Sequence, residues 1–412
     1  MSETVAELLA EHGSPLWLAD VDRARERLGG LRTAWTAAWG DADGLEIAYS
    51  YKTNRTTAFL RAFADDGAGA EVVCAAEYAL ARDVIGVAGP RITVNGPAKP
   101  DALLARAAAD GALVIADSAA ELERLAVAGV TRAGIRVGLP GPEGTPSRFG
   151  IPPEQVVAAG RRARDLGLAL EVLHVHLVST DFTAELGAEA TGTLAASVRV
   201  GWAKAPAVHA QAAAVLAALA AELGGVDAID IGGGIPAAPS PAADAHAAAV
   251  ADALRAGGFS GRLMLEPGRA LVADAVDLAI TVVAVKTLGD GSACAVLDAG
   301  TNLLPGALWA WPRLEPLTRR AAAEGATPTL VAGPLCLNID VVAPAAALGE
   351  LAVGDVLMAR EVGAYQQVQA TQFGDLRPAV VVREGAAWRL HRRREELSDL
   401  ITLDREEAQW SA

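Results

Sequence analysis

The sequence contains little cysteine, and its few cysteines are widely spaced. Cys74, Cys294 and Cys336 are an odd number, and no two of them form a CxxC pair. This pattern fits neither a disulfide framework nor a structural zinc site. Because free thiols persist in a reducing compartment, we expect a cytoplasmic protein.

Positive charge is also scarce. The chain carries 35 lysine and arginine residues against 50 aspartate and glutamate residues, a formal net charge of -15, and it has no long basic run. A surface that binds nucleic acid needs clustered basic side chains. We therefore expect no nucleic acid partner.

Long uninterrupted apolar runs are missing as well. Asp, His, Gln or Lys breaks the apolar stretches, and the first segment, MSETVAELLAEHG, lacks the basic start and apolar core of an export signal. We expect neither a membrane span nor an export signal.

The chain is long and rich in apolar residues. Its 412 residues exceed the size of one ordinary core, and 52% hydrophobic content with 21% charged residues is typical of compact proteins. The length predicts two domains, or one large barrel with an accessory domain.

Eight short apolar runs, each ending at turn residues, predict strands. They are LEIAYSYK (45–52), AEVVCA (70–75), RITVNGP (91–97), ALVIADS (112–118), GIRVGL (134–139), LEVLHVHLVS (170–179), DAIDIGGG (227–234) and LMLEPGR (263–269). Segments with helical apolar spacing lie between them. This alternation predicts an α/β fold with a (β/α)8, TIM-like barrel, although a doubly wound sheet gives the same pattern.

After about residue 270 the pattern changes, because strand-like runs follow one another with few helices between them. This predicts a C-terminal all-β domain. A strand-like stretch near residue 16 precedes the first barrel strand and could join that domain. We expect the barrel to span residues 26–270 and the β-domain to comprise residues 1–25 and 271–412.

Active sites of (β/α)8 barrels form at the carboxyl ends of the strands. In this chain an unusual set of polar and small residues lies there: Lys52, Arg136, His174, His176, Ser179, Gly232, Gly233, Gly234, Glu266 and Arg269.

Lys52 is one of only four lysines and alone closes an apolar barrel strand. A lysine that is desolvated at a barrel mouth loses part of its preference for the charged form and becomes an amine nucleophile. The alternative is an ordinary lysine whose ammonium group reaches solvent.

Three glycines directly follow the strand that ends IDI, so the backbone there can approach a phosphate. The run fits neither the dinucleotide-binding nor the Walker pattern. A strand-end lysine together with this glycine turn suggests pyridoxal 5'-phosphate, which has both an aldehyde and a phosphate. Glu266 could then pair with the pyridine nitrogen, which favours loss of CO2 from the α-carbon. Its alternative partner is Arg269.

His174 and His176 alternate on one strand. His176 could stack on a cofactor ring, or the pair could bind a metal ion. Because no Asp or Glu is obviously grouped beside them, we favour stacking and expect no metal site.

Seven motifs in register resemble the PLP-dependent fold-type III decarboxylases of the diaminopimelate/ornithine decarboxylase group. They are YSYKTN (49–54), SRFGI (147–151), HVHLVS (174–179), IDIGGGIP (229–236), EPGR (266–269), GPLC....D (333–340) and GAY (363–365). The resemblance covers about residues 14–400 and implies an alanine-racemase-like barrel with a C-terminal β-domain.

The resemblance implies a role for each matching residue. Lys52 would hold the cofactor covalently, His176 would stack on its ring and Glu266 would pair with its nitrogen. The remaining cofactor-binding residues would surround the phosphate or support the pocket: Arg136, Ser179, Gly232, Gly233, Gly234, Gly268, Arg269 and Tyr365.

Cys336 matches the family cysteine that protonates the α-carbon after CO2 leaves. In the family this loop reaches the active site of the partner subunit, so the resemblance implies a homodimer with shared sites. The alternative is a small buried hydrophobic residue. Arg269, Leu337 and Asp340 would contact the substrate.

The chain also departs from the family pattern. Diaminopimelate decarboxylases usually read CESxD, whereas this chain has Leu337 after Cys336, and residues 298–311 lack the family's arginine and tyrosine. A charged distal group on the substrate would find no partner there. We therefore expect an amino acid or derivative with an uncharged, masked or carrier-tethered distal end, in specialised biosynthesis.

The leading hypothesis is thus a PLP-dependent carboxy-lyase acting in amino acid metabolism. One alternative is a fold-type III racemase, although such racemases place arginine on the pyridine nitrogen where this chain has Glu266. The others are a diaminopimelate- or ornithine-type decarboxylase acting on a free amino acid, and a non-catalytic PLP-binding protein.

Overall fold

The structure, a computed structural model, describes residues 3–140, 144, 146–177, 205–318 and 328–404. These residues divide into two units, one formed by residues 23–177 and 205–272, the other by residues 3–22 and 273–404. Among the described helices, none combines the length and the apolar character that crossing a membrane requires.

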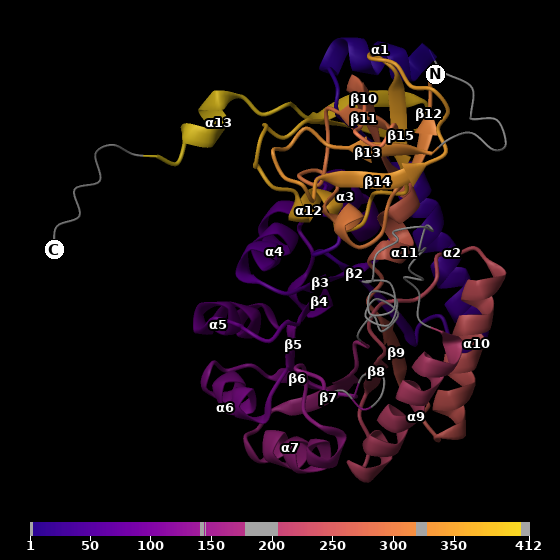
Figure 1. Cartoon of the computed structure of the whole chain (residues 1–412). Helices are drawn as coiled ribbons and strands as arrows, with labels where there is room; N and C mark the ends of the chain where they lie inside the picture. The colour runs from indigo at the N-terminus through magenta and orange to yellow at the C-terminus, as the bar shows by residue number, and fades with distance from the viewer. Residues whose placement is uncertain (1–2, 141–143, 145, 178–204, 319–327, 405–412) are drawn as a thin grey trace. The chain divides into compact units, whose positions relative to one another are not determined.

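Eight parallel strands close into a barrel in the first unit, in the order in which they occur along the chain (Figure 1). The strands are β2 (Leu45–Ser50), β3 (Gly69–Val72), β4 (Ile92–Val94), β5 (Leu113–Ala116), β6 (Arg132–Arg136), β7 (Ala169–His174), β8 (Ala228–Asp230) and β9 (Arg262–Leu265). All eight runs expected from the sequence overlap a strand, and the predicted (β/α)8 barrel is confirmed.

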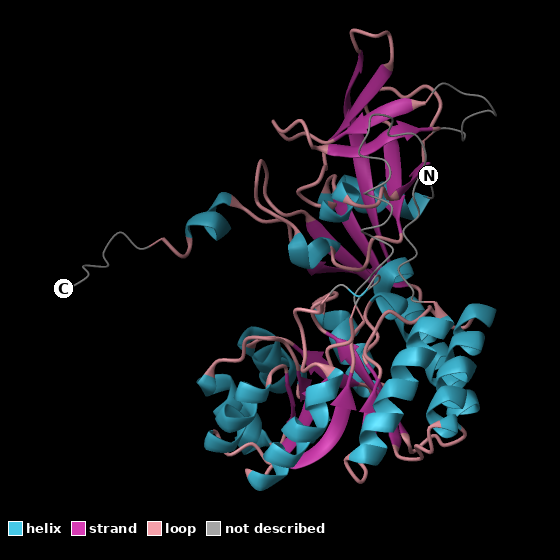
Figure 2. Ribbon diagram, turned by 60° about the horizontal axis from the view of Figure 1, so that its bottom comes forward, coloured by secondary structure: helices cyan, strands magenta, loops and turns pink. Residues whose placement is uncertain are grey.

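Helices surround these strands, as Figure 2 shows for the barrel unit. They are α2 (Val21–Trp39), α3 (Thr57–Asp65), α4 (Ala75–Ala79), α5 (Asp101–Asp110), α6 (Ala119–Val127), α7 (Pro153–Asp165), α9 (Pro206–Glu222), α10 (Pro241–Ala256) and α11 (Arg269–Val272). Local signals fix their ends. Ser240 begins α10 by accepting a hydrogen bond from the Ala243 N–H, and Gly111 ends α5 in the left-handed region, with φ +71°.

Apolar side chains fill the barrel. One buried cluster joins residues from β5, β7, β8 and β9, namely Leu113, Ile115, Val172, Ala228 and Met264. Strands that are covered by helices outside and by this cluster inside must be apolar on both faces. Polar side chains on these strands are therefore conspicuous, and most of those considered below lie at the carboxyl ends.

The second unit is built mainly from one nine-stranded sheet, so the expected C-terminal β-domain is confirmed. The path β14-β13-β11-β10-β1-β16-β17 carries β15 and β12 as a branch from β10. Its strands are β1 (Leu16–Asp20), β10 (Val276–Thr287), β11 (Ala293–Leu297), β12 (Arg313–Pro316), β13 (Thr329–Ala332), β14 (Val341–Ala346), β15 (Val356–Arg360), β16 (Ala379–Glu384) and β17 (Ala387–Arg392). Short helices accompany it: α1 (Glu3–His12), α12 (Gln366–Gln369) and α13 (Leu397–Ile401).

Strand β1 lies inside this sheet and not at its edge. It pairs antiparallel with β10 and parallel with β16, so that Leu16 lies opposite both Ala279 and Ala379. The first four residues of β1 are buried. A strand that is paired on both sides and buried on both faces has no solvated backbone edge, which suits the apolar run LWLA.

Candidate active site

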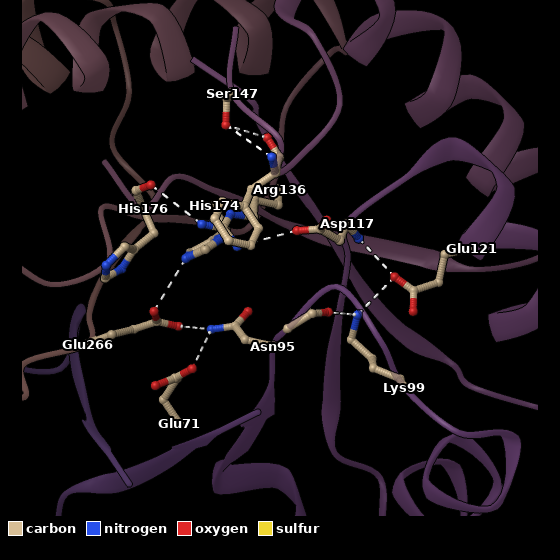
Figure 3. A network of polar contacts seen from close by, with 12 residues as sticks. Glu71, Asn95, Lys99, Asp117, Glu121, Arg136, Ser147, His174, His176 and Glu266 are labelled. Carbon is tan, nitrogen blue, oxygen red and sulfur yellow. Dashed lines mark hydrogen bonds and ion pairs between the residues drawn. The ribbon is translucent and has the colours of Figure 1, made fainter. Parts of the chain in front are cut away.

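Polar side chains converge at the carboxyl ends of the barrel strands, where the sequence predicts the site (Figure 3). Lys52 follows β2, Glu71 lies in β3, and Asn95 follows β4. Arg136 and His174 end β6 and β7, and Glu266 follows β9.

Lys52 is tied to a buried carboxylate. Its Nζ lies 2.5 Å from Glu71 Oε2, and Ser50 Oγ donates to the same oxygen at 2.6 Å. The Glu71 side chain is fully buried, whereas 30% of the Lys52 side chain is exposed. The ammonium group therefore faces an acid inside the barrel mouth, which argues against the alternative of a lysine that only reaches toward solvent.

Glu266 is a buried acid with two polar neighbours. Asn95 Nδ2 donates to its Oε1 at 2.6 Å, and His174 Nε2 lies 3.3 Å from its Oε2. Burial alone would raise the pKa of Glu266, but His174, Lys52 and His176 together hold that pKa below its usual range. Glu266 is thus a carboxylate at neutral pH.

A second buried acid, Asp230, lies close to Glu266. Its Oδ1 accepts the Gly232 N–H at 2.7 Å, and its Oδ2 is buried without a partner among the described residues. Burial, followed by the charge of Glu266, raises the pKa of Asp230 well above its usual value. Because two adjacent buried carboxyls do not both ionise readily, Asp230 carries the proton and Glu266 the charge.

His174 and His176 lie with Glu266 in one group. One nitrogen or oxygen atom from each residue falls within 4.8 Å of the other two, which is close enough to hold a metal ion. The expectation that no acid is grouped beside the two histidines is wrong. The reason is that Glu266 is remote in sequence but comes from β9, two strands from β7 in the closed barrel.

The His176 ring is neutral and its orientation is fixed. Burial and then the charge of Lys52 lower the pKa of His176 well below its usual value. The Gly233 N–H donates to its Nδ1 at 3.3 Å, so the single ring proton of the neutral form sits on Nε2.

The glycine turn after β8 packs too closely for side chains. A Cβ on Gly232 would lie 2.5 Å from the Val175 carbonyl oxygen, and one on Gly233 would lie 2.7 Å from that of Glu266. Gly232 and Gly234 also have φ of +68° and +80°. The N–H groups of Gly232 and Gly233 already donate to Asp230 and His176. Among the described residues the Gly234 N–H has no such acceptor, so it is the N–H of this triplet that can bind a ligand.

Arg136 is held at the same end of the barrel. It pairs with Asp117 at 3.3 Å, and its guanidinium lies over the Phe149 ring, 4.5 Å from the centroid. Phe149 belongs to the motif SRFGI, which thereby contacts a predicted site residue. Ser179 lies outside the described residues, so its predicted role stays a prediction.

Several residues of this network are not among those expected from the sequence, notably Glu71, Asn95, Lys99 and Asp117. Glu71 does leave a signal, because an acid inside the apolar run AEVVCA is unusual in a barrel strand. Asn95 leaves almost none, since a strand commonly ends in a turn residue such as Asn.

The other predicted residues lie in the β-domain. Cys336 and Leu337 are exposed on the loop between β13 and β14, so the alternative of a buried cysteine is wrong. Asp340 is buried, and its carboxylate accepts hydrogen bonds from Thr301 N at 2.6 Å and Leu335 N at 2.7 Å. It thus joins two loops, and its contact with substrate stays a prediction.

Tyr365 has a strained backbone. Its φ is +66°, in the left-handed region that non-glycine residues seldom adopt, and it directly precedes α12. Such strain costs on the order of 1–3 kcal/mol and tends to persist at functional sites. The strain supports the functional role predicted for the GAY motif.

A family model and two known proteins each match most of this chain. The family model described as "Pyridoxal-dependent decarboxylase, C-terminal sheet domain" matches residues 19–363. The chain is 32% identical to the diaminopimelate decarboxylase of Deinococcus radiodurans, over 94% of this chain and 95% of the relative. It is 30% identical to that of Methanothermobacter thermautotrophicus, over 96% and 92%.

A solved structure shares the fold. The diaminopimelate decarboxylase from M. jannaschii in complex with L-lysine superposes with a TM-score of 0.83 at 23% identity, over 97% of this chain and 94% of that one.

Proposed function

The chain belongs to the pyridoxal-dependent decarboxylase family, and we propose that its substrate is an amino acid or amino acid derivative with an uncharged, masked or carrier-tethered distal end. As a member of this family it is a carboxy-lyase, and its cofactor is pyridoxal 5'-phosphate. This assignment favours decarboxylation over the racemase and non-catalytic alternatives.

The side chains at the barrel mouth fit this cofactor. An ionised Glu266 suits a protonated pyridine nitrogen, and a neutral His176 can stack on a positively charged ring without repulsion. The amine of Lys52 suits the aldehyde, and the N–H of Gly234 is available to the phosphate. We assign these four contacts as proposals, together with Arg136, Gly268, Arg269 and Tyr365 near the phosphate.

When bound, the cofactor supplies an electron sink for the bond that breaks as CO2 leaves the α-carbon. The protein's part is to place charges and protons. Glu71 Oε2, 2.5 Å from Lys52 Nζ, is positioned to take the proton that the ammonium group must lose before its nitrogen can react. The Glu266 carboxylate would hold a proton on the pyridine nitrogen.

We further propose a homodimer with shared sites, in which Cys336 serves the site of the partner subunit. The support is the family motif and the exposure of Cys336, which leaves its thiol accessible. In this role the thiol delivers a proton to the α-carbon after CO2 has left.

We expect Cys336→Ala to lower turnover about 10²- to 10⁴-fold, the range that a positioned acid contributes. Cofactor binding should be unchanged, because the thiol acts only after decarboxylation. Single-turnover measurements of CO2 release and of amine formation separate the two steps. Cys294→Ala, which changes a buried cysteine of the same domain, is the control. Equal amine yields from wild type and Cys336→Ala would remove Cys336 from the mechanism.

The proposal for the distal end rests on apolar side chains around the Cys336 loop. Leu337, which follows Cys336 where the family pattern CESxD has an acid, is 42% exposed, and Ile339 is 62% exposed. Trp309 is also 42% exposed, so it is not a core residue of the β-domain. Apolar side chains such as these cannot pair with a charged distal group, whose desolvation they would leave uncompensated.

The segment that carries Trp309 is bonded to a second segment with an exposed apolar side chain, Phe373. The Thr371 N–H donates to the Asn302 carbonyl oxygen at 2.9 Å, and Gly306 N donates to Gln366 Oε1 at 2.9 Å. These bonds tie the segment that carries Phe373, which is 48% exposed, to the segment that carries Trp309. One bond between backbone groups and one to the Gln366 side chain therefore hold these two segments together.

A kinetic comparison tests the substrate. We expect kcat/KM for an amino acid with a neutral or amide-linked distal end to exceed that for free meso-diaminopimelate, ornithine and lysine by about 10²-fold or more. The competing function, decarboxylation of free diaminopimelate, is favoured by the names of the relatives. A kcat/KM for a free diamino acid of roughly 10⁴ M⁻¹s⁻¹ or more would establish that function instead.

A further inference from the structure

Asn95 occupies the centre of the polar network at the barrel mouth (Figure 3). Its Nδ2 donates to Glu266 Oε1 at 2.6 Å and to Glu71 Oε1 at 3.2 Å. The residue is 5% exposed, and both carboxylates are buried. One amide group therefore joins the acid that faces Lys52 to the acid assigned to the cofactor.

The contact with Glu266 spans the barrel. Asn95 follows β4 and Glu266 follows β9, and two strands, β2 and β3, separate them in the closed sheet. Backbone pairing links these two strands only indirectly, through β3 and β2. The side-chain hydrogen bond joins the two strand ends directly.

The turn that carries Asn95 is itself held in place. The Asn95 N–H donates to the Val72 carbonyl oxygen at 2.8 Å. Lys99, which is 2% exposed, donates to the Gly96 carbonyl oxygen at 2.6 Å and to Glu121 Oε2 at 2.8 Å. A buried lysine committed to a backbone carbonyl and one acid fixes the turn, so Asn95 has little freedom to move.

We propose that Asn95 is a positioning residue that holds the Glu266 carboxylate in place for the pyridine nitrogen of the cofactor. This inference rests on the role proposed above for Glu266. An amide is suited to the task because it supplies two N–H donors without charge. A lysine or arginine there would neutralise the negative charge that Glu266 needs, and an acid would repel it.

A buried atom without a hydrogen-bond partner supports the positioning role of Asn95. Its Oδ1 is buried without a hydrogen-bond partner among the described residues. Leaving a buried acceptor unpaired costs on the order of 1–3 kcal/mol. The amide is therefore oriented by the two carboxylates at the expense of its own oxygen.

A binding experiment on the cofactor-free protein tests the proposal. Two probes are compared by equilibrium titration, namely pyridoxal 5'-phosphate and its analogue with carbon in place of the ring nitrogen. Wild type should prefer the natural cofactor by about 10- to 100-fold, the range for a hydrogen bond to a charged group. In Asn95→Leu this preference should fall about tenfold, because Glu266 loses its orienting donor.

Thr93→Val is the matched control, because Thr93 lies in β4, two residues before Asn95, and is also a buried polar residue. Its preference should equal that of wild type. Asn95→Asp preserves the shape of the side chain and serves if the leucine variant does not fold; its preference should fall as well.

The results distinguish failure of the Asn95 role from failure of the Glu266 assignment. An unchanged preference in both Asn95 variants, or an equal loss of affinity for both probes, would overturn the positioning role while Glu266 keeps its assignment. A wild type that does not distinguish the probes would overturn the Glu266 assignment, and with it the role of Asn95.

Discussion

Replacement of Lys52 by alanine should abolish turnover, with a loss of at least about 10³-fold, because the variant lacks the amine nucleophile. Reduction of the loaded wild type with borohydride should leave the cofactor's mass on the peptide that contains Lys52. The alanine variant should carry no such mass. Mass spectrometry of the digested protein measures both.

The ion pair with Glu71 complicates an alanine substitution. Removing Lys52 leaves a fully buried carboxylate without its ammonium partner, which destabilises the barrel mouth independently of chemistry. Lys52→Arg separates the two effects, because arginine keeps the positive charge but is not a nucleophile at neutral pH. We expect it to retain more stability than alanine and to be equally inactive.

Lys286→Ala is the surface control, since Lys286 is an exposed residue of β10 in the other unit. It should leave cofactor attachment and turnover unchanged. Attachment of the cofactor to a residue other than Lys52 in wild type would contradict the assignment.

Replacement of Glu266 by glutamine should lower turnover about 10²- to 10³-fold, the range for losing one preorganised electrostatic contact. Glutamine has the same shape and keeps an oxygen for Asn95, but it has no charge to hold the pyridine nitrogen protonated. The cofactor should still attach to Lys52. Absorbance of the loaded protein monitors attachment, and initial rates monitor turnover.

Glu46→Gln is the control for this substitution. Glu46 is the second residue of β2, at the other end of the barrel, where it pairs with Arg262 at 2.7 Å. It should alter stability slightly and turnover not at all. Full activity of Glu266→Gln would show that the nitrogen needs no anionic partner here.

Much of the barrel could be predicted from the sequence because its signals are local. Each strand is a short apolar run that ends at turn residues, and residues such as Lys52 and Glu266 are conspicuous because they follow such runs directly. The rule that barrel sites gather at these ends then places them together.

The contacts between side chains could not be predicted in the same way. Whether Asn95 reaches Glu266 depends on how far each strand is shifted along the barrel axis, and sequence periodicity does not report that shift. The sequence likewise does not report how β7 and β9 are aligned in the barrel, so it did not show that Glu266 lies beside the two histidines. The order of strands in the β-domain is likewise set by long-range pairing.

The position of β1 in the middle of its sheet has a consequence for biosynthesis. The run Leu16–Asp20 leaves the ribosome well before its parallel neighbour β16, which begins about 360 residues later. At roughly 5–20 residues per second, this strand waits on the order of a minute for its partner. The barrel can form during that interval, whereas the sheet cannot close until β16 has been synthesised. Until β10 and β16 have been synthesised, the nascent chain therefore exposes an apolar strand without its sheet partners, a state that is prone to aggregation.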